Sequence, residues 1–289
     1  MSSLALALVI VAALIHAGWN YLTKCSDNKL VFSWLFRWVG AIVYLPLILW
    51  QPSLLNLPRF IWPFVVTTGL IHALYFWALT AAYDNGDLSV SYPLSRGLGS
   101  LLILLFAALL LGERPSWLGL LGVLLIAAGV YILHLRSFHA SDALLPLRSL
   151  GTPGGDYAAL TGVCVAGYSL VDKLAVQHVS PLVYIYLIFV AAALFSTPLI
   201  GRRGWKLVYE EWLRNWRTIS IVGVLCLFAY LLILWAMTLA PVSYVVAVRN
   251  LSIVFGALLG TWLLRESYGQ QRIAGSVLVC LGATCIALA

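Results

Sequence analysis

Long apolar runs separated by short polar connections extend along the whole chain, and this pattern predicts a bundle of membrane-spanning helices. A helix needs roughly 20 mostly apolar residues to cross the hydrocarbon layer of a bilayer. Dividing the sequence at charged residues, prolines and glycines gives ten runs of about that length. They are Leu4–Thr23, Leu30–Trp50, Ile61–Tyr83, Ser89–Leu111 and Ser116–Leu135 in the first half, and Tyr157–Val176, Pro181–Ile200, Thr218–Leu239, Val242–Leu264 and Gly269–Leu288 in the second. The expected fold is therefore an all-α integral membrane protein with ten transmembrane helices.

Two longer polar segments interrupt the apolar pattern. Residues 136–154 are expected to be a linker loop between a first five-helix repeat, 1–135, and a second, 155–289. The other segment, Gly201–Arg217, mixes five Lys/Arg with three Trp and two Glu. This mixture favours an amphipathic stretch at the membrane interface over a nucleic-acid-binding segment.

The two halves of the chain repeat each other. Four pairs of residues share an offset of 153 positions: Arg96 and Arg249, Glu113 and Glu266, Gly122 and Gly275, and Gly129 and Gly282. The first spans also agree, because "AGWNYLTK" in the first half aligns with "AGYSLVDK" in the second. Five spans per repeat is an odd number, so the second repeat must enter the membrane from the opposite side. Inverted repeats of this kind are typical of transporters that work by alternating access.

Composition and charge agree with a lipid environment. Of the 289 residues, 63% are hydrophobic and only 9% are charged, whereas a soluble domain has roughly 25% charged residues. Three of the 17 Lys/Arg, namely Arg37, Arg96 and Arg249, lie within predicted spans; eleven follow odd-numbered spans and three follow even-numbered spans. The positive-inside rule then places the eleven in the cytoplasm and both termini outside. We expect a multi-pass protein of the inner cell membrane, with no nucleic-acid partner.

No motif points to a cofactor or to catalysis. The five cysteines have neither Cys-x-x-Cys spacing nor a histidine at zinc-finger distance, so no disulfide, metal or cofactor is expected. The ten acidic residues fall almost entirely at span ends or in connections, and no Gly-x-Ser-x-Gly nucleophile motif occurs. An integral-membrane enzyme is therefore disfavoured. A passive channel is also disfavoured, because no charged ring or carbonyl filter motif is present.

Several motifs resemble the EamA domain of the drug/metabolite transporter superfamily. They are "LIHAGWNYLTK", "GDLSVSYPLSR" and "LLLGERPSWLGLLGVLLIAAGVYIL" in the first half, and "APVSYVVAVRN" and "LLRESYGQQRIAGSVLVCLGATCIAL" in the second. The resemblance covers nearly the whole chain as two EamA repeats. It implies a ten-helix carrier that exports or exchanges small metabolites, often amino acids or related compounds. It also implies a central cavity lined by the middle of each half.

One position departs from a related group, the small multidrug resistance proteins. Those proteins carry an acidic residue eight positions before the motif lysine, where it binds cationic drugs and protons. The matching positions here are His16 and Val165. The departure weakens the alternative of a proton-coupled multidrug or cation exporter, which nevertheless stays open.

The main candidate site residues are Arg96 and Arg249. Each lies seven or eight residues into a predicted span, or roughly 10–12 Å along a helix axis. The inverted repeat presents the two from opposite faces of the membrane. Their guanidinium groups suit a carboxylate or phosphate ligand. Alternatively, each arginine caps backbone carbonyls at a broken helix or extends to the interface.

Further candidates are polar or aromatic residues within the spans. Asn20 lies four residues after His16 on the same helical face, and with Trp19 and Tyr21 it forms a polar and aromatic patch on the first span. Asn250 adds an amide beside Arg249. His16 and His72 are candidates for proton coupling, although a histidine in a bundle is also a common packing residue. The aromatic residues that could stack on a substrate include Tyr75, Tyr92, Tyr230, Trp235 and Tyr244.

Five residues are assigned structural or gating roles. Pro93 frees a backbone carbonyl in the fourth span and marks a hinge or a simple kink. Glu113 and Glu266 precede the helix starts at Ser116 and Gly269, whose free N–H groups they can satisfy. Lys24 and Lys173 close the first-span motifs and are interpreted as anchors at the interface.

The sequence thus predicts a secondary transporter for a small polar or anionic metabolite, such as an amino acid or organic acid. The two repeats would rock around a site near Asn20, Arg96 and Arg249, in an exporter or an exchanger. The expected partners are the lipid bilayer, a small-molecule substrate and a proton or counter-substrate. The protein is expected to be a monomer or a weak oligomer.

Overall fold

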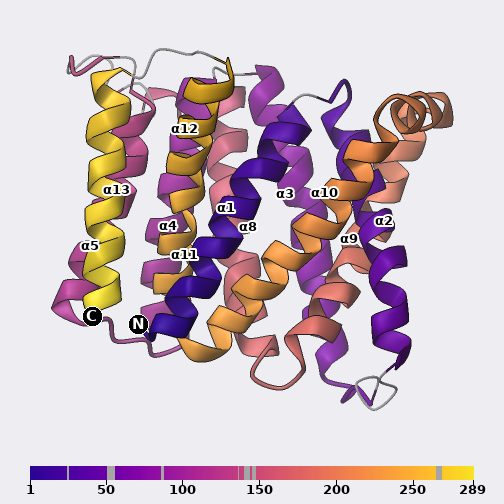
Figure 1. Ribbon diagram of the computed structural model, residues 1–289, viewed down its shortest axis with the longest axis horizontal. Helices are drawn as coiled ribbons and strands as arrows, with labels where there is room; N and C mark the ends of the chain where they lie inside the picture. Colours follow the sequence, from indigo (N-terminus) through magenta and orange to yellow (C-terminus); the bar gives the residue numbers. More distant parts are fainter. Residues whose placement is uncertain are drawn as a thin grey trace.

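The predicted all-helical bundle is confirmed. A computed structural model of the chain describes residues 1–24, 26–50, 56–85, 88–135, 137–139, 144, 148–264 and 269–289. Its helices are α1 (Ser3–Lys24), α2 (Lys29–Trp50), α3 (Ile61–Asn85), α4 (Leu88–Leu110), α5 (Trp117–Leu133), α8 (Pro153–Ala175), α9 (Pro181–Arg203), α10 (Trp205–Leu239), α11 (Val242–Arg249), α12 (Leu251–Leu264) and α13 (Gln270–Leu288). They stand side by side in one layered bundle, with both termini at the same end (Figure 1). The architecture is ten spans arranged as two inverted five-helix repeats.

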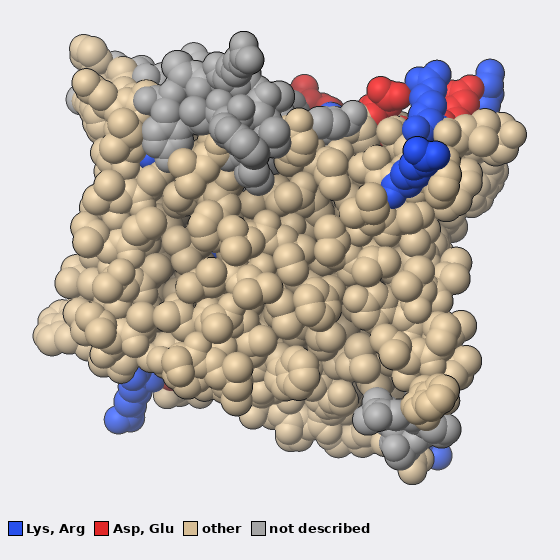
Figure 2. Space-filling view, viewed as in Figure 1, with Lys and Arg blue, Asp and Glu red and all other residues tan. Residues whose placement is uncertain are grey.

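The surface is that of a protein surrounded by lipid. Seven of the described helices are long and apolar enough to cross a membrane, and three shorter apolar helices complete the bundle. Charged side chains gather at the two ends of the bundle, and a broad uncharged band separates them (Figure 2). Many large apolar side chains are exposed in this band, because hydrocarbon takes the place of water there.

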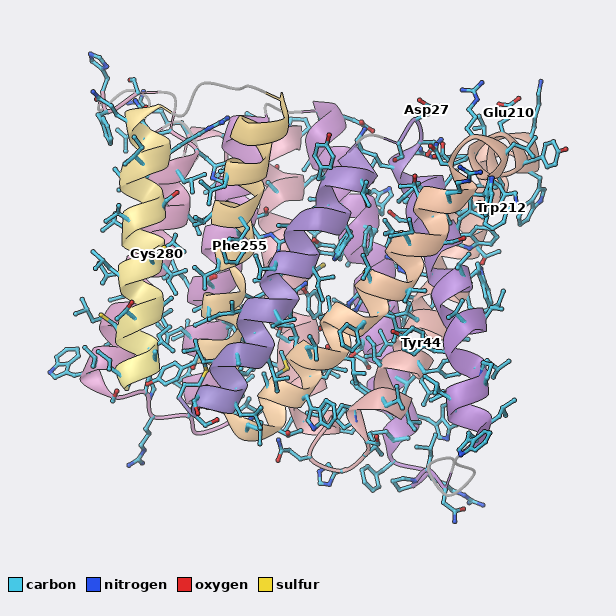
Figure 3. The ribbon with its side chains drawn as sticks, viewed as in Figure 1. Asp27, Tyr44, Glu210, Trp212, Phe255 and Cys280 are labelled. Atoms are coloured by element: carbon cyan, nitrogen blue, oxygen red, sulfur yellow. The ribbon has the colours of Figure 1, made fainter. Side chains whose placement is uncertain are left out.

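The eighth span differs from its predicted limits. The run was expected to begin at Thr218, but α10 begins at Trp205 and continues without interruption to Leu239. The first turns of α10 expose Trp205, Trp212 and Trp216 to the surroundings. Asp27, Glu210 and Trp212 lie together at this end of the bundle (Figure 3). The amphipathic stretch is therefore the leading part of a long helix rather than a separate element.

The ninth span is broken, whereas one continuous helix was predicted. It divides into α11 and α12 at Asn250, whose backbone N–H bonds to the carbonyl of Ala247. The side-chain amide of Asn250 donates to Ser100 Oγ of α4 at 2.8 Å. The fourth span, where Pro93 suggested a hinge, is instead one continuous helix from Leu88 to Leu110. The interruption thus lies in the second repeat, beside Arg249 and not at a proline.

The repeats interlock at the centre and pair again at one edge. Helix α8 of the second repeat packs along α3 and α4 of the first, while α1 packs against α10 and α12. At the edge, α5 packs along α13 (Figure 1). Their contact is made by glycines: an added Cβ on Gly122 would lie 2.7 Å from the carbonyl oxygen of Gly282.

Candidate functional site

A small cavity lies where the two repeats meet. Its volume is about 60 Å³, which is room for about two water molecules. Helices α1, α2 and α3 of the first repeat and α8, α9, α10 and α11 of the second line it. The lining residues are Ala12, His16, Trp19, Phe36, Arg37, His72, Tyr75, Phe76, Tyr168, Phe189, Cys226, Ala229, Tyr230, Ile233 and Arg249.

The cavity wall is rich in buried polar atoms without a protein partner. Among the described residues, four side chains have such an atom: His16 Nε2, Trp19 Nε1, Arg37 Nη2 and Trp38 Nε1. The first three belong to residues that line the cavity. A buried polar atom left unpaired costs roughly 1–3 kcal/mol, and more when the group is charged. The wall is thus suited to a ligand that supplies hydrogen-bond acceptors.

Arg37 is the most buried cation of the cavity, with 3% of its surface exposed. Its guanidinium carbon lies 3.9 Å from the centre of the Phe76 ring and 5.7 Å from that of Phe36. These cation–π contacts offset part of the cost of burying the charge. Nη2 remains available toward the cavity, so an anionic group is the complementary ligand.

Arg249 is the second cavity arginine and ends α11. Its Nη1 donates to Tyr168 Oη at 3.5 Å, and its guanidinium carbon lies 5.2 Å from the centre of the Tyr230 ring. A cation at a helix C-terminus is stabilised by the helix dipole. The break at Asn250 therefore presents a positive group from the middle of a span.

A buried carboxylate lies behind the aromatic wall. Asp172 of α8 is 0% exposed. Its Oδ1 accepts hydrogen bonds from Thr68 Oγ1 at 2.9 Å and from Tyr184 Oη at 3.0 Å, and its Oδ2 accepts one from Tyr230 Oη at 2.5 Å. His72 Nδ1 donates to the Thr68 carbonyl at 3.1 Å. Since Tyr230 also lines the cavity, its hydroxyl connects the cavity wall to Asp172.

The structure brings together six of the residues proposed from the sequence. Those that line the cavity are His16, Trp19, His72, Tyr75, Tyr230 and Arg249. Asn20 and Arg96 are half-buried and are not part of its lining. The central arginines are therefore Arg37 and Arg249, rather than the symmetric pair Arg96 and Arg249.

Three other proposed residues lie away from the cavity. Trp235 is 53% exposed on the outer surface. Tyr244 is buried, and its hydroxyl accepts a hydrogen bond from the Ser116 backbone N–H at 3.1 Å. Asn250 binds Ser100, as described above. The side chains of Lys24, Tyr92 and Pro93, and all of Glu266, lie outside the described residues.

Glu113 and Lys173 both contact helix ends in the second repeat. Glu113 was expected to serve the helix that starts after it, but its carboxylate accepts from the N–H groups of Val242 and Ser243, at 2.6 and 3.3 Å. It therefore caps α11, which belongs to the other repeat. Lys173 was interpreted as an interface anchor; instead its Nζ donates to the carbonyls of Met237 and Ala240, at 2.5 and 2.9 Å, at the end of α10.

A family comparison agrees with this two-repeat arrangement. The model of the EamA-like transporter family matches residues 3–135 and again residues 153–288. The chain belongs to the EamA-like transporter family. It is thus a multi-pass membrane transporter of the drug/metabolite transporter superfamily, with a small-molecule substrate, and not an enzyme.

Individual relatives agree with the family. The pseudopaline exporter CntI of Pseudomonas aeruginosa is 26% identical over 231 residues, which cover 78% of this chain and 74% of CntI. The multidrug resistance protein EbrB of Bacillus subtilis is 35% identical over 82 residues, 28% of this chain and 68% of EbrB. A protein of known crystal structure matches 100% of this chain and 98% of its own with a TM-score of 0.70 at 21% identity, which shows a shared fold.

Sequence reasoning missed Arg37, Tyr168 and Asp172 as parts of the site. A signal existed for Tyr168, because the aligned motifs place it opposite Trp19. Arg37 was recognised as a cation within a span, but no role was assigned to it. Asp172 follows a long apolar run near the end of its span, so its sequence position resembled that of an interfacial acid.

Proposed function

We propose that this protein exports or exchanges a small anionic or polar metabolite, with amino acids and organic acids as the substrate class. The observation that carries the proposal is the donor-rich cavity between the repeats. Arg37 and Arg249 supply positive charge there, and His16 and Trp19 supply further polar atoms without partners. A carboxylate offers the acceptor oxygens that such a wall lacks.

The aromatic residues of the wall set a second requirement. The rings of Tyr75, Tyr168 and Tyr230 surround the polar groups, with centroid separations of 6.0 Å for Tyr75–Tyr168 and 6.2 Å for Tyr168–Tyr230. Flat apolar surface beside a charged anchor is suited to an organic anion with a carbon skeleton, more than to a bare inorganic ion.

The small size of the cavity supports alternating access. Pockets for small metabolites usually measure about 300–1,000 Å³, far above the 60 Å³ found here. The cavity of this conformation is therefore too small for such a metabolite, and the repeats must move apart to admit one. The inverted architecture supplies an equivalent movement toward each membrane face.

The alternative is export of organic cations, which the similarity to EbrB brings into consideration. Both charged groups that line the cavity, Arg37 and Arg249, are positive, and they would repel a cation. The anion proposal is therefore preferred. We further propose that the transporter lies in the inner membrane with both termini outside, in agreement with the distribution of Lys and Arg.

Uptake into proteoliposomes tests the proposal. The purified chain is assayed with radiolabelled L-glutamate and succinate, and with choline as the cationic probe. We expect saturable, trans-stimulated uptake of an anionic probe. Arg37→Gln and Arg249→Gln should each weaken it about 10- to 100-fold, the effect of losing a hydrogen bond from a buried charged group.

Arg217→Gln is the matched control, because Arg217 is an exposed arginine far from the cavity lining. It should transport at the wild-type rate. Saturable uptake of choline with both anions excluded would contradict the proposal. Unchanged anion uptake in folded Arg37 and Arg249 variants would do so as well.

A further inference from the structure

The oxygen atoms around Asp172 form a closed cluster with more contacts than hydroxyl protons. Four oxygen–oxygen contacts link its members. Besides the three contacts to the carboxylate, from Thr68, Tyr184 and Tyr230, the Thr68 hydroxyl lies 3.0 Å from the Tyr184 hydroxyl. Each hydroxyl group has a single proton to donate. Three protons are therefore available for four contacts when the carboxylate is ionised.

One additional proton on Asp172 completes the cluster. A protonated Oδ1 donates to Thr68, Thr68 donates to Tyr184, and Tyr184 donates back to Oδ1, while Tyr230 continues to donate to Oδ2. Every contact then contains a hydrogen atom. With an ionised carboxylate, the Thr68 and Tyr184 oxygens would face each other at 3.0 Å without one. Within the described part of the chain no lysine or arginine forms an ion pair with Asp172, and burying an unpaired charge is costly.

We propose that Asp172 carries a proton in this conformation, and that its gain and loss of the proton link transport to the proton gradient. The inference rests on the proposed function, which concerns the same cavity. Asp172 is distinct from the candidates His16 and His72, and it does not occupy the position of the acidic residue in the small multidrug resistance proteins.

Tyr230 gives the linkage a physical route. Its hydroxyl contacts Asp172, its ring lines the cavity, and the Arg249 guanidinium lies over that ring at 5.2 Å. An ionised Asp172 would place a negative charge behind Arg249 and weaken its attraction for an anion. A protonated Asp172 is neutral, so the positive charge of Arg249 attracts the anionic ligand at full strength. Proton and anion therefore favour each other's binding, and by reciprocity each raises the affinity of the site for the other by the same factor.

Other titratable groups on neighbouring helices contact the Asp172 cluster. Tyr184 of α9 and Tyr230 of α10 hydrogen-bond to its carboxyl group, His72 of α3 bonds to the Thr68 carbonyl, and Arg249 of α11 lies over the Tyr230 ring. His72 is the competing proton carrier, because it is titratable and lies beside the same cluster. Its ring centroid is 4.4 Å from that of Tyr168, and its Nδ1 bonds to the Thr68 carbonyl. An imidazole and a carboxyl group have different vibrational spectra, so the two are separable.

Infrared difference spectroscopy on the full chain in lipid nanodiscs tests the protonation directly. At neutral pH we expect the C=O stretching band of a protonated carboxyl group, shifted by carbon-isotope-labelled aspartate. The band should be lost in Asp172→Asn, whose neutral amide imitates the protonated form. Tyr230→Phe should move the band to higher frequency, because the bond to Oδ2 is removed. If Asp172→Asn does not fold, the frequency shift in Tyr230→Phe tests the assignment of the band to Asp172.

Glu211→Gln is the matched control. Glu211 is the other buried acid described, 3% exposed, and it accepts from the Asn28 backbone N–H and from Asn215. Its substitution should leave the aspartate band in place. An ionised aspartate spectrum at neutral pH, or a band that persists in Asp172→Asn and is unmoved in Tyr230→Phe, would overturn the inference. The measurement needs no substrate, so its failure is distinct from failure of anion uptake.

Discussion

The edge and the centre of this transporter use the repeat in opposite ways. At the edge, α5 and α13 meet through reciprocal glycines: a Cβ on Gly129 would lie 2.7 Å from the Gly275 carbonyl, and one on Gly275 would lie 2.6 Å from the Gly129 carbonyl. Both copies meet the same steric demand, which only glycine satisfies at this distance. The two repeats therefore have the same residue at these places.

At the centre the matching positions differ. Aligning Pro46 of α2 with Pro198 of α9 places Arg37 opposite Phe189, and the first-span motifs place Asp172 opposite Thr23. One repeat thus supplies the buried cation and the other the buried acid. The duplicated scaffold is therefore symmetric where backbones touch, whereas the chemistry of the cavity depends on departures from that symmetry.

The largest expected effect lies at the edge. Gly129→Leu forces a side chain into the space of the Gly275 carbonyl and Val279, so the helices must separate. We expect destabilisation of about 3 kcal/mol or more, seen as aggregation in size-exclusion chromatography and a large fall in Tm. Gly256→Ala on α12 is the control. No atom of the described residues lies within 4 Å of its added Cβ, so that variant should keep or slightly raise Tm. A well-folded Gly129→Leu protein would show that the edge contact is not required.

At the centre, substitution should change function while the fold is kept. In Asp172→Asn, trans-stimulated exchange of the transported anion should continue, but the response to pH should disappear. In the wild type, we expect a pH above neutral to remove the proton from Asp172 and to weaken anion binding, by up to about tenfold per pH unit for one linked proton. Uptake into proteoliposomes over a pH series measures the slope. An equal slope in both proteins would assign the pH response to another group, such as His72.

The smallest effect concerns the contact between repeats at Glu113. Glu113→Gln removes the negative charge from the start of α11 but retains one acceptor oxygen. We expect a loss of about 1 kcal/mol, measured as a modest fall in Tm. Glu210→Gln is the matched control, because among the described residues Glu210 forms an ion pair with exposed Lys206 alone, at 3.9 Å, and such surface pairs contribute little. Equal Tm values for the two variants would deny Glu113 a role in joining the repeats.

Much of the architecture could be predicted from the sequence because the determining property is local. Span limits follow from apolar length, and most predicted runs agree with the helices within a few residues. The two exceptions depend on contacts with other parts of the chain. Helix α10 begins early where Glu211 binds Asn28 of the first repeat, and the ninth span breaks where Asn250 binds Ser100.

The candidate site was only partly predictable. His16, Trp19, His72, Tyr230 and Arg249 stand out as polar or aromatic groups within spans, and they line the cavity. Trp235 has the same sequence character and faces outward. In helices that are apolar on every side, no polar face marks the direction of the protein interior, so sequence alone cannot separate these cases.

By itself, the sequence determined the membrane setting, the ten spans, the inverted repeat and the transporter family, because hydropathy and repeated motifs are properties of neighbouring residues. Only the tertiary structure decided which charged groups meet at the centre. It selected Arg37 over Arg96, and it buried Asp172 beneath three hydroxyl groups from α3, α9 and α10. The reason is physical: whether a polar group is paired, unpaired or protonated depends on atoms that packing brings from distant parts of the chain.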